Sequence, residues 1–103
     1  MGAAEFWTKA RGKNAKAAFN TAVEDARYEH GHGGYTGSIA EKSGFVMIDN
    51  PGGTPESAEE LADKMLREGD KRTDDKWGPA GCIKLRDLDD GLKEYLFFGY
   101  ASS

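Results

Sequence analysis

A glycine motif that occurs twice constrains the fold of this chain more than any other feature of its sequence. The segments GYTGSIAEK (34–42) and GPAGCIKLR (78–86) share the pattern G-x-x-G-x-I. Each follows a predicted helix and a polar loop, and each precedes a second apolar segment, at 45–49 and at 94–100. We therefore predict that an αββ unit occurs twice. The result would be an α+β fold with a four-stranded antiparallel sheet and both helices on one face.

The repeat divides the chain into three parts. Residues 1–13 form an N-terminal segment, residues 14–50 the first αββ unit and residues 54–101 the second. At 103 residues, the chain has the size of one domain with one hydrophobic core. We expect a single domain over 1–103.

Two helices are predicted from helical spacing and from signals at their ends. The first begins after Asn14, a candidate N-cap, and stops at Gly31. The second has Thr54 as its N-cap, Pro55 at its first position and Gly69 as its stop. The apolar face of the first helix consists of Phe19, Ala22, Val23, Ala26 and His30.

The C-terminal third is predicted to form a hairpin of the strands AGCIKLRD and KEYLFFGYAS, joined by Asp89, Asp90 and Gly91. The second strand is apolar on both faces, so it is either central in the sheet or covered by a partner. A sheet with both helices on one face leaves its other face exposed. We therefore expect a homodimer or larger even-numbered homo-oligomer, with strand 94–100 at or behind the interface.

Residues 36–42 allow two interpretations. By comparison with the second repeat they form a strand, which turns at Ser43 and Gly44 into the next strand. However, Ser38 and Glu41 match the S-x-x-E capping box, which would begin a short helix at Ser38. We favour the strand because the second repeat has a clear strand pattern.

The stretch HGHGGYTGSIAEK (30–42) is the candidate ligand site. Backbone N–H groups of a glycine loop can converge on an anion, and an aromatic ring can stack on a base. Such a site suits a phosphorylated nucleotide, although neither a P-loop nor a G-x-G-x-x-G motif is present. The alternative is that the glycines only supply positive φ in a turn. The predicted binding residues are His32, Gly33, Gly34, Tyr35, Thr36, Ser38, Lys42, Trp77 and Arg86.

Other candidate sites are weaker. DNPGGTPES (49–57) resembles an anion site at a helix N-terminus, but Asp49 and Glu56 repel anions, so we expect a capped turn. His30 and His32 form an H-x-H pair without a third ligand, and we expect no metal. We expect no cofactor and find no enzyme signature, so a small enzyme that uses His32 is the least favoured hypothesis.

Composition excludes several classes of protein. A net charge of −4 argues against nonspecific binding of duplex DNA, which needs a basic face. No apolar run has the length of a membrane span, and the N-terminus lacks an apolar signal core. The single cysteine, Cys82, suits a reducing compartment. We expect a cytoplasmic protein.

The segments GHGGYTGSIAEK, KWGPAGCIKL and YLFFGYASS resemble those of small bacteriophage-type accessory proteins. This resemblance implies a role against host defence, in the cytoplasm of the host. Such proteins act by sequestering signalling nucleotides, by blocking a defence protein or, rarely, by enzymatic turnover. Together with the glycine loops, this resemblance leads us to expect a non-enzymatic protein that sequesters a phosphorylated nucleotide signal.

The alternative is a protein–protein inhibitor of a host defence protein. It depends on the acidic second half and on REGDKRTDDKWG, a charged loop that ends near Trp77. Trp77 itself is predicted to be either a core side chain, a stacking platform for a base or the anchor of such an interface.

Overall fold

The structure, a computed structural model, describes residues 2–30 and 36–102. It is an α+β fold with two α-helices and a four-stranded mixed sheet. The elements follow one another as β1 (Ala3–Gly12), α1 (Ala15–His30), the 3-10 turn η1 (Ile39–Glu41), β2 (Phe45–Met47), α2 (Pro55–Glu68), β3 (Ala80–Asp87), the 3-10 turn η2 (Asp89–Gly91) and β4 (Lys93–Ser102).

The sheet has the strand order β1-β4-β3-β2. Strand β4 is antiparallel to both of its neighbours, whereas β2 is parallel to β3. The predicted antiparallel sheet is therefore wrong at β2. The chain passes from β2 to β3 through α2, and a crossover through a helix brings the next strand back in parallel.

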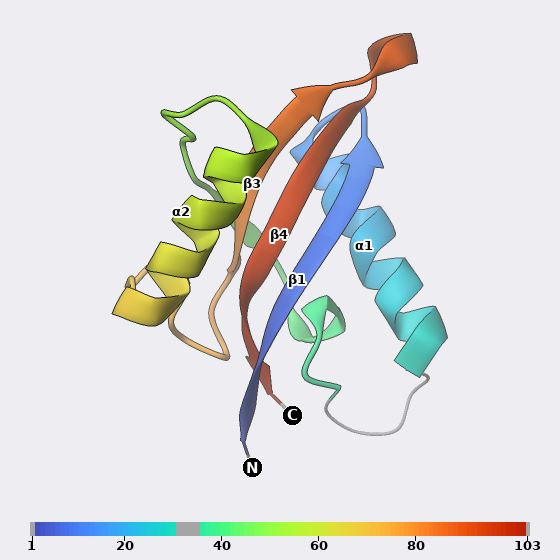
Figure 1. Cartoon of the computed structure of the whole chain (residues 1–103). Coiled ribbons are helices and arrows are strands. Elements are labelled where there is room, and N and C mark those ends of the chain that lie inside the picture. The colour runs from blue at the N-terminus through green and yellow to red at the C-terminus, as the bar shows by residue number, and fades with distance from the viewer. Residues whose placement is uncertain (1, 31–35, 103) are drawn as a thin grey trace.

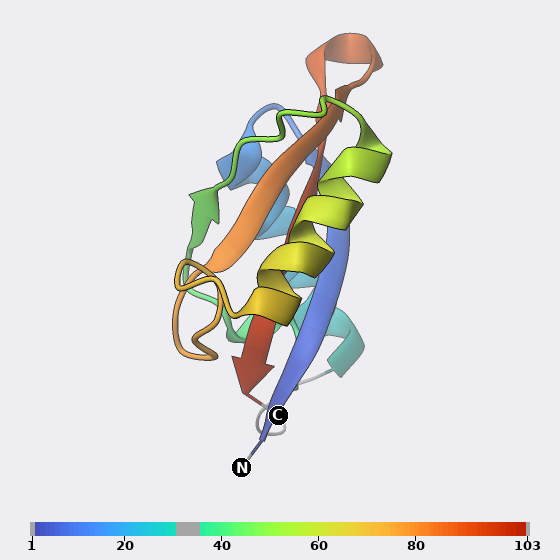
Figure 2. The same ribbon diagram turned by 60° about the vertical axis from the view of Figure 1, so that its left-hand side comes forward.

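The two helices cover opposite faces of the sheet, so the prediction of both on one face is also wrong. In Figures 1 and 2 the sheet lies between α1 and α2. The face toward α1 buries Phe19 and Val23 of the helix against Tyr95 and Phe97 of β4. The face toward α2 has its own core: Ile48, Ala58, Ala62, Met65, Leu66, Ile83, Leu85, Leu96 and Phe98.

This arrangement explains why β4 is apolar on both faces. Phe97 and Phe98 point to opposite faces, and both side chains are fully buried. The strand is central, because β1 and β3 pair with its two edges. Of the two alternatives for strand 94–100, the structure shows the central one. The homo-oligomer, with this strand at or behind its interface, stays a prediction.

The duplicated unit is matched only in its second half. Elements α2, β3 and β4 form the predicted helix–strand–strand order. After α1, however, the predicted strand 36–42 is replaced by η1, and β2 has three residues. The Ser38 hydroxyl accepts a hydrogen bond from the Ala40 N–H, so the cap at Ser38 is local and begins the turn. The position beside β4 is taken by β1, formed by the N-terminal segment.

The start of α1 and both ends of α2 follow the expected signals, whereas Gly31, the expected stop of the first helix, lies outside the described residues. The Asn14 side chain accepts a hydrogen bond from the Ala17 N–H, and α1 begins there. In α2 the Thr54 and Ser57 side chains each accept from the backbone N–H of the other, and Gly69 ends the helix with a left-handed φ of 67°. No helix in the described part of the chain has the length and apolar character that a membrane span needs.

Candidate functional site

Two loops meet at the end of the sheet where β2 and β3 begin. The first, residues 36–44, enters β2; the second, residues 70–79, leads from α2 into β3. The Ala80 N–H donates to the Gly44 carbonyl at 3.0 Å, which ties the two loops together. The two loops that follow the helices therefore lie next to each other at this end of the sheet.

The first loop is organised by its own polar side chains. The Thr36 hydroxyl lies 2.7 Å from the Ser38 hydroxyl and donates to the Glu41 carboxylate at 2.8 Å. The Thr36 N–H donates to the same carboxylate at 3.2 Å. Gly37 has a φ of 67°, which a side chain would disfavour, and its N–H donates to the Ser102 carbonyl. Thr36 and Ser38 thus serve the fold of the loop.

Lys42 is the residue that joins the two loops. Its side chain is only 4% exposed, and its ammonium donates to the carbonyls of Asp75, Lys76 and Gly78 at 3.2, 3.2 and 2.9 Å. An ammonium group has three N–H donors, so these carbonyls account for all of them. Burial lowers the pKa of Lys42 below its usual value, and the nearby charge of Asp75 opposes this shift.

The second loop carries Trp77, which is 59% exposed. The prediction of a core side chain is therefore wrong. The Trp77 N–H donates to the Asp75 carboxylate at 2.9 Å, and the Gly78 N–H donates to the Asp75 carbonyl at 2.9 Å. The Lys76 ammonium lies 5.4 Å from the centre of the indole ring. Earlier in the loop, Arg72 makes a bidentate contact with Asp70 at 3.0 and 2.9 Å. Contacts within the loop and from Lys42 thus hold the backbone that presents Trp77.

A groove runs between α1 and the segment 42–45, beside the first loop. It consists of two depressions of about 230 and 310 Å³, which share Phe19, Asn20 and Ser43 as lining residues. Phe19 and Phe45 pack together with ring centres 5.2 Å apart. The remaining lining residues are Lys16, Val23, Glu24, Arg27, Lys42 and Gly44. We call this feature the α1 groove.

The predicted binding residues are only partly assembled. His32, Gly33, Gly34 and Tyr35 lie outside the described residues. The structure brings Lys42 to the loop of Trp77, with Thr36 and Ser38 in the adjoining loop. Arg86 lies elsewhere. It is six positions along β3 from Ala80, about 20 Å at the usual rise of a strand. There it pairs with the buried carboxylate of Glu94 at 2.8 Å.

Sequence reasoning missed the basic and amide side chains of α1 that line the groove. Lys16, Asn20 and Arg27 had the appearance of a solvated helix face, and they are indeed exposed. The available signal was their helical spacing beside Phe19 and Val23. Helical spacing indicates that these three side chains lie on the same side of α1. It does not indicate that segment 42–45 packs beside that side of the helix.

The structure describes only some of the weaker candidates. Asn50, Thr54 and Ser57 bond to one another at the start of α2, which confirms the expected capped turn. Among the described residues no group of three or more His, Cys, Asp or Glu side chains could hold a metal. The H-x-H pair falls on the His30 side chain and His32, which the structure does not describe.

Comparisons with protein-family models, with curated proteins and with solved structures found no match.

Proposed function

We propose that this chain is a non-enzymatic binding protein that docks onto another protein through Trp77. One observation carries the proposal: a tryptophan that is 59% exposed stands on a loop whose backbone is held by the buried ammonium of Lys42. Tryptophan is among the residues that contribute most to protein interfaces when they enter a partner's pocket.

The fixed loop matters because binding normally orders the groups that take part in it. A loop that is already held loses less conformational freedom when a partner binds, so more of the contact energy is retained as affinity. Lys71, Arg72, Asp74 and Lys76 surround Trp77 in the sequence with charges of both signs. Such a charged rim around one aromatic anchor favours a selected partner. In a phage-type accessory protein, that partner would be a host defence protein whose action is blocked.

The test compares Trp77→Ala with Tyr28→Ala, a matched loss of an aromatic side chain that is 92% exposed on α1. Each protein is used to capture partners from host extract, followed by quantitative mass spectrometry and affinity measurement with the purified partner. We expect Trp77→Ala to weaken binding by about 30-fold or more, the effect of losing a 2 kcal/mol anchor. Tyr28→Ala should bind like the wild type.

Stability separates an anchor from a structural residue. Because Trp77 is largely exposed, Trp77→Ala should change the free energy of unfolding by no more than about 0.5 kcal/mol. A partner that binds the wild type and both variants equally well would contradict the proposal.

Lys42→Met tests the role of the fixed loop separately. It keeps the unbranched apolar part of the side chain but removes the ammonium, so three carbonyls lose their donor. We expect a loss of roughly 1–3 kcal/mol in folding stability and weaker partner binding, although Trp77 is still present. Unchanged affinity in a folded Lys42→Met protein would show that the loop needs no support.

A second candidate function is the binding and sequestration of a phosphorylated nucleotide in the α1 groove. The observation that favours it is the lining: Phe19 and Phe45 offer aromatic surface, and Lys16 and Arg27 supply cations. Lys42 does not serve as the phosphate ligand in this second candidate function, because backbone carbonyls occupy its N–H donors.

Thermal unfolding with a panel of linear and cyclic nucleotides tests this candidate. A ligand at 100 times its Kd should stabilise the fold by roughly 2.7 kcal/mol, and Arg27→Ala should abolish the effect. An unchanged melting temperature across the panel would exclude it.

A further inference from the structure

Strand β1 is a long edge of the sheet. Its ten residues, Ala3–Gly12, pair with β4 from end to end, so one of its two edges is occupied. Within residues 2–30 and 36–102 no strand pairs with the other edge. The opposite edge strand, β2, has only three residues. A long strand with a row of unpaired N–H and carbonyl groups is a template for another strand.

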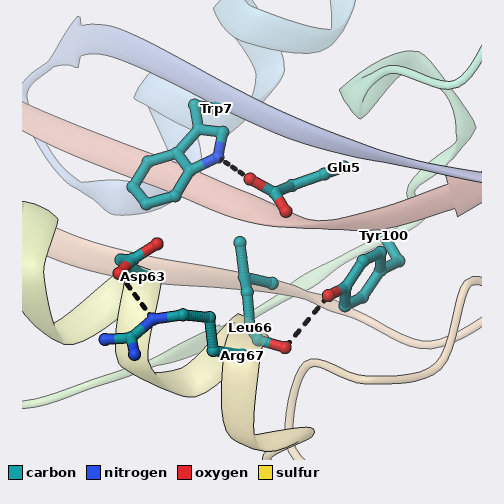
Figure 3. Close-up of polar contacts among 6 residues, drawn as sticks. All are labelled: Glu5, Trp7, Asp63, Leu66, Arg67 and Tyr100. Carbon is teal, nitrogen blue, oxygen red and sulfur yellow. Dashed lines mark hydrogen bonds and ion pairs between the residues drawn. The ribbon is translucent and has the colours of Figure 1, made fainter.

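The side chains on one face of β1 are those of Glu5, Trp7, Lys9 and Arg11. This is the face that α2 covers, because the Lys9 ammonium lies 3.1 Å from the Glu59 carboxylate of that helix. Figure 3 shows Trp7 and Glu5 extending from β1 toward α2, where Tyr100 donates to the Leu66 carbonyl. The indole packs toward Phe98 with ring centres 6.3 Å apart, and its N–H donates to Glu5. Trp7 is still 39% exposed at this edge.

We propose that β1 pairs with β1 of a second copy, antiparallel about a twofold axis at Trp7, so that the two sheets become one. A twofold axis normal to the sheet keeps equivalent side chains on one face. In this register Glu5 lies opposite Lys9 of the second copy, and Lys9 opposite Glu5. Trp7 lies opposite its own equivalent, and Ala3 opposite Arg11.

The charges of the strand select this register. Opposite charges in directly facing positions stabilise an antiparallel pair, as do facing aromatic rings, whereas like charges destabilise it. An axis at Glu5 or at Lys9 would place identical charges against each other. An axis at Phe6 would leave Glu5 and Lys9 without a charged partner on the second copy of β1. An axis at Thr8 would place Glu5 opposite Arg11, and this is the one competing register with a favourable charge pair.

Charge reversal within β1 distinguishes these registers. Glu5→Lys alone and Lys9→Glu alone each place like charges opposite each other in the Trp7 register. The double variant Glu5→Lys/Lys9→Glu restores both pairs there. In the Thr8 register the double variant would set two positive side chains against each other at positions 5 and 11, and association would stay lost.

The experiment is sedimentation velocity of the wild type, both single variants, the double variant and Lys71→Glu, from micromolar to submillimolar concentration. Lys71→Glu repeats the charge change of Lys9→Glu in an exposed loop away from β1. Circular dichroism establishes that each variant is folded. We expect a species of twice 11.2 kDa for the wild type, Lys71→Glu and the double variant. Each single variant should dissociate at least tenfold more readily.

The proposal is overturned by three results. The first is a wild type of 11.2 kDa at every concentration. The second is an oligomer that both single variants leave intact, which would place the interface elsewhere. The third is a double variant that folds but fails to reassociate, which would exclude the Trp7 register.

Discussion

Cys82 lies in β3 with no exposed surface, in the core that faces α1, and it makes no disulfide. Burial raises the pKa of its thiol to about 12 from an ordinary value of 9.0. The unfolded chain therefore releases this proton at lower pH than the folded chain does. The stability that the neutral thiol contributes is complete below pH 9.0 and is lost as the pH rises toward 12.

Cys82→Ala should remove this dependence. Between pH 8 and pH 10, the free energy of unfolding of the wild type should fall by about 1 kcal/mol more than that of the variant, measured by urea unfolding. Lys42, whose pKa burial lowers, titrates in both proteins and cancels in the comparison. Burial raises the pKa of Tyr95 and the charge of the nearby Cys82 raises it further, so the measured difference includes this coupling between the two groups. Equal losses in the two proteins would show that the thiol is already accessible to ionisation.

Lys42 shows how far a single residue can be interpreted from sequence. Its position at the end of a glycine-rich stretch indicated a cation near a ligand. The groups that occupy its ammonium are carbonyls 33 to 36 positions later in the chain. A backbone carbonyl has no signature in the sequence, so no local pattern could reveal this contact. The exposure of Trp77 depends on the same long-range packing.

At the scale of elements, the two copies of the glycine motif need glycine for different reasons. Gly37 adopts a left-handed φ in the first loop. Gly81 does not; a Cβ there would lie 2.5 Å from the Phe98 ring and 2.9 Å from Thr73. The shared glycine pattern therefore reflects two different structural constraints, so it does not imply the same structure in both places. Helix α2 was predicted correctly because Thr54, Pro55 and Gly69 act within one turn of its ends.

Gly81→Ala should destabilise the fold by about 1–3 kcal/mol, because the added methyl group forces the Phe98 ring out of a packed core. The matched control is Gly44→Ala at the entry to β2, where a Cβ would meet nothing within 4 Å. That change should be neutral or stabilise the fold by up to about 1 kcal/mol, because it restricts the unfolded chain. Denaturant unfolding measures both. Equal effects of the two substitutions would contradict the close approach at Gly81.

At the scale of the whole molecule, sequence patterns predicted the number of helices and the α+β class but not the side on which each helix packs. Apolar residues on both faces of β4 were compatible with a central strand or with a partner. Which alternative holds depends on β1, where Phe6 is the one buried side chain, so that its sequence has a weak strand pattern. Once β1 occupies one edge of β4, the strand is central and each helix covers one face.

This arrangement predicts the order in which backbone amides exchange with solvent. Strand β4 is bonded on both edges and covered on both faces, so its amides should exchange only through global unfolding. Strand β2 has three residues at the margin of the sheet, and Met47 is 50% exposed, so its amides should exchange through local opening at a much lower free energy. Hydrogen–deuterium exchange with peptide mass spectrometry measures both in one experiment.

Phe97→Ala should lower the free energy of global unfolding by roughly 3–5 kcal/mol. Exchange in β4 should become faster by the factor that corresponds to this loss, whereas exchange in β2 should stay almost unchanged. If β4 in the wild type exchanged as fast as β2, the strand could not be the centre of a sheet with a helix on each face.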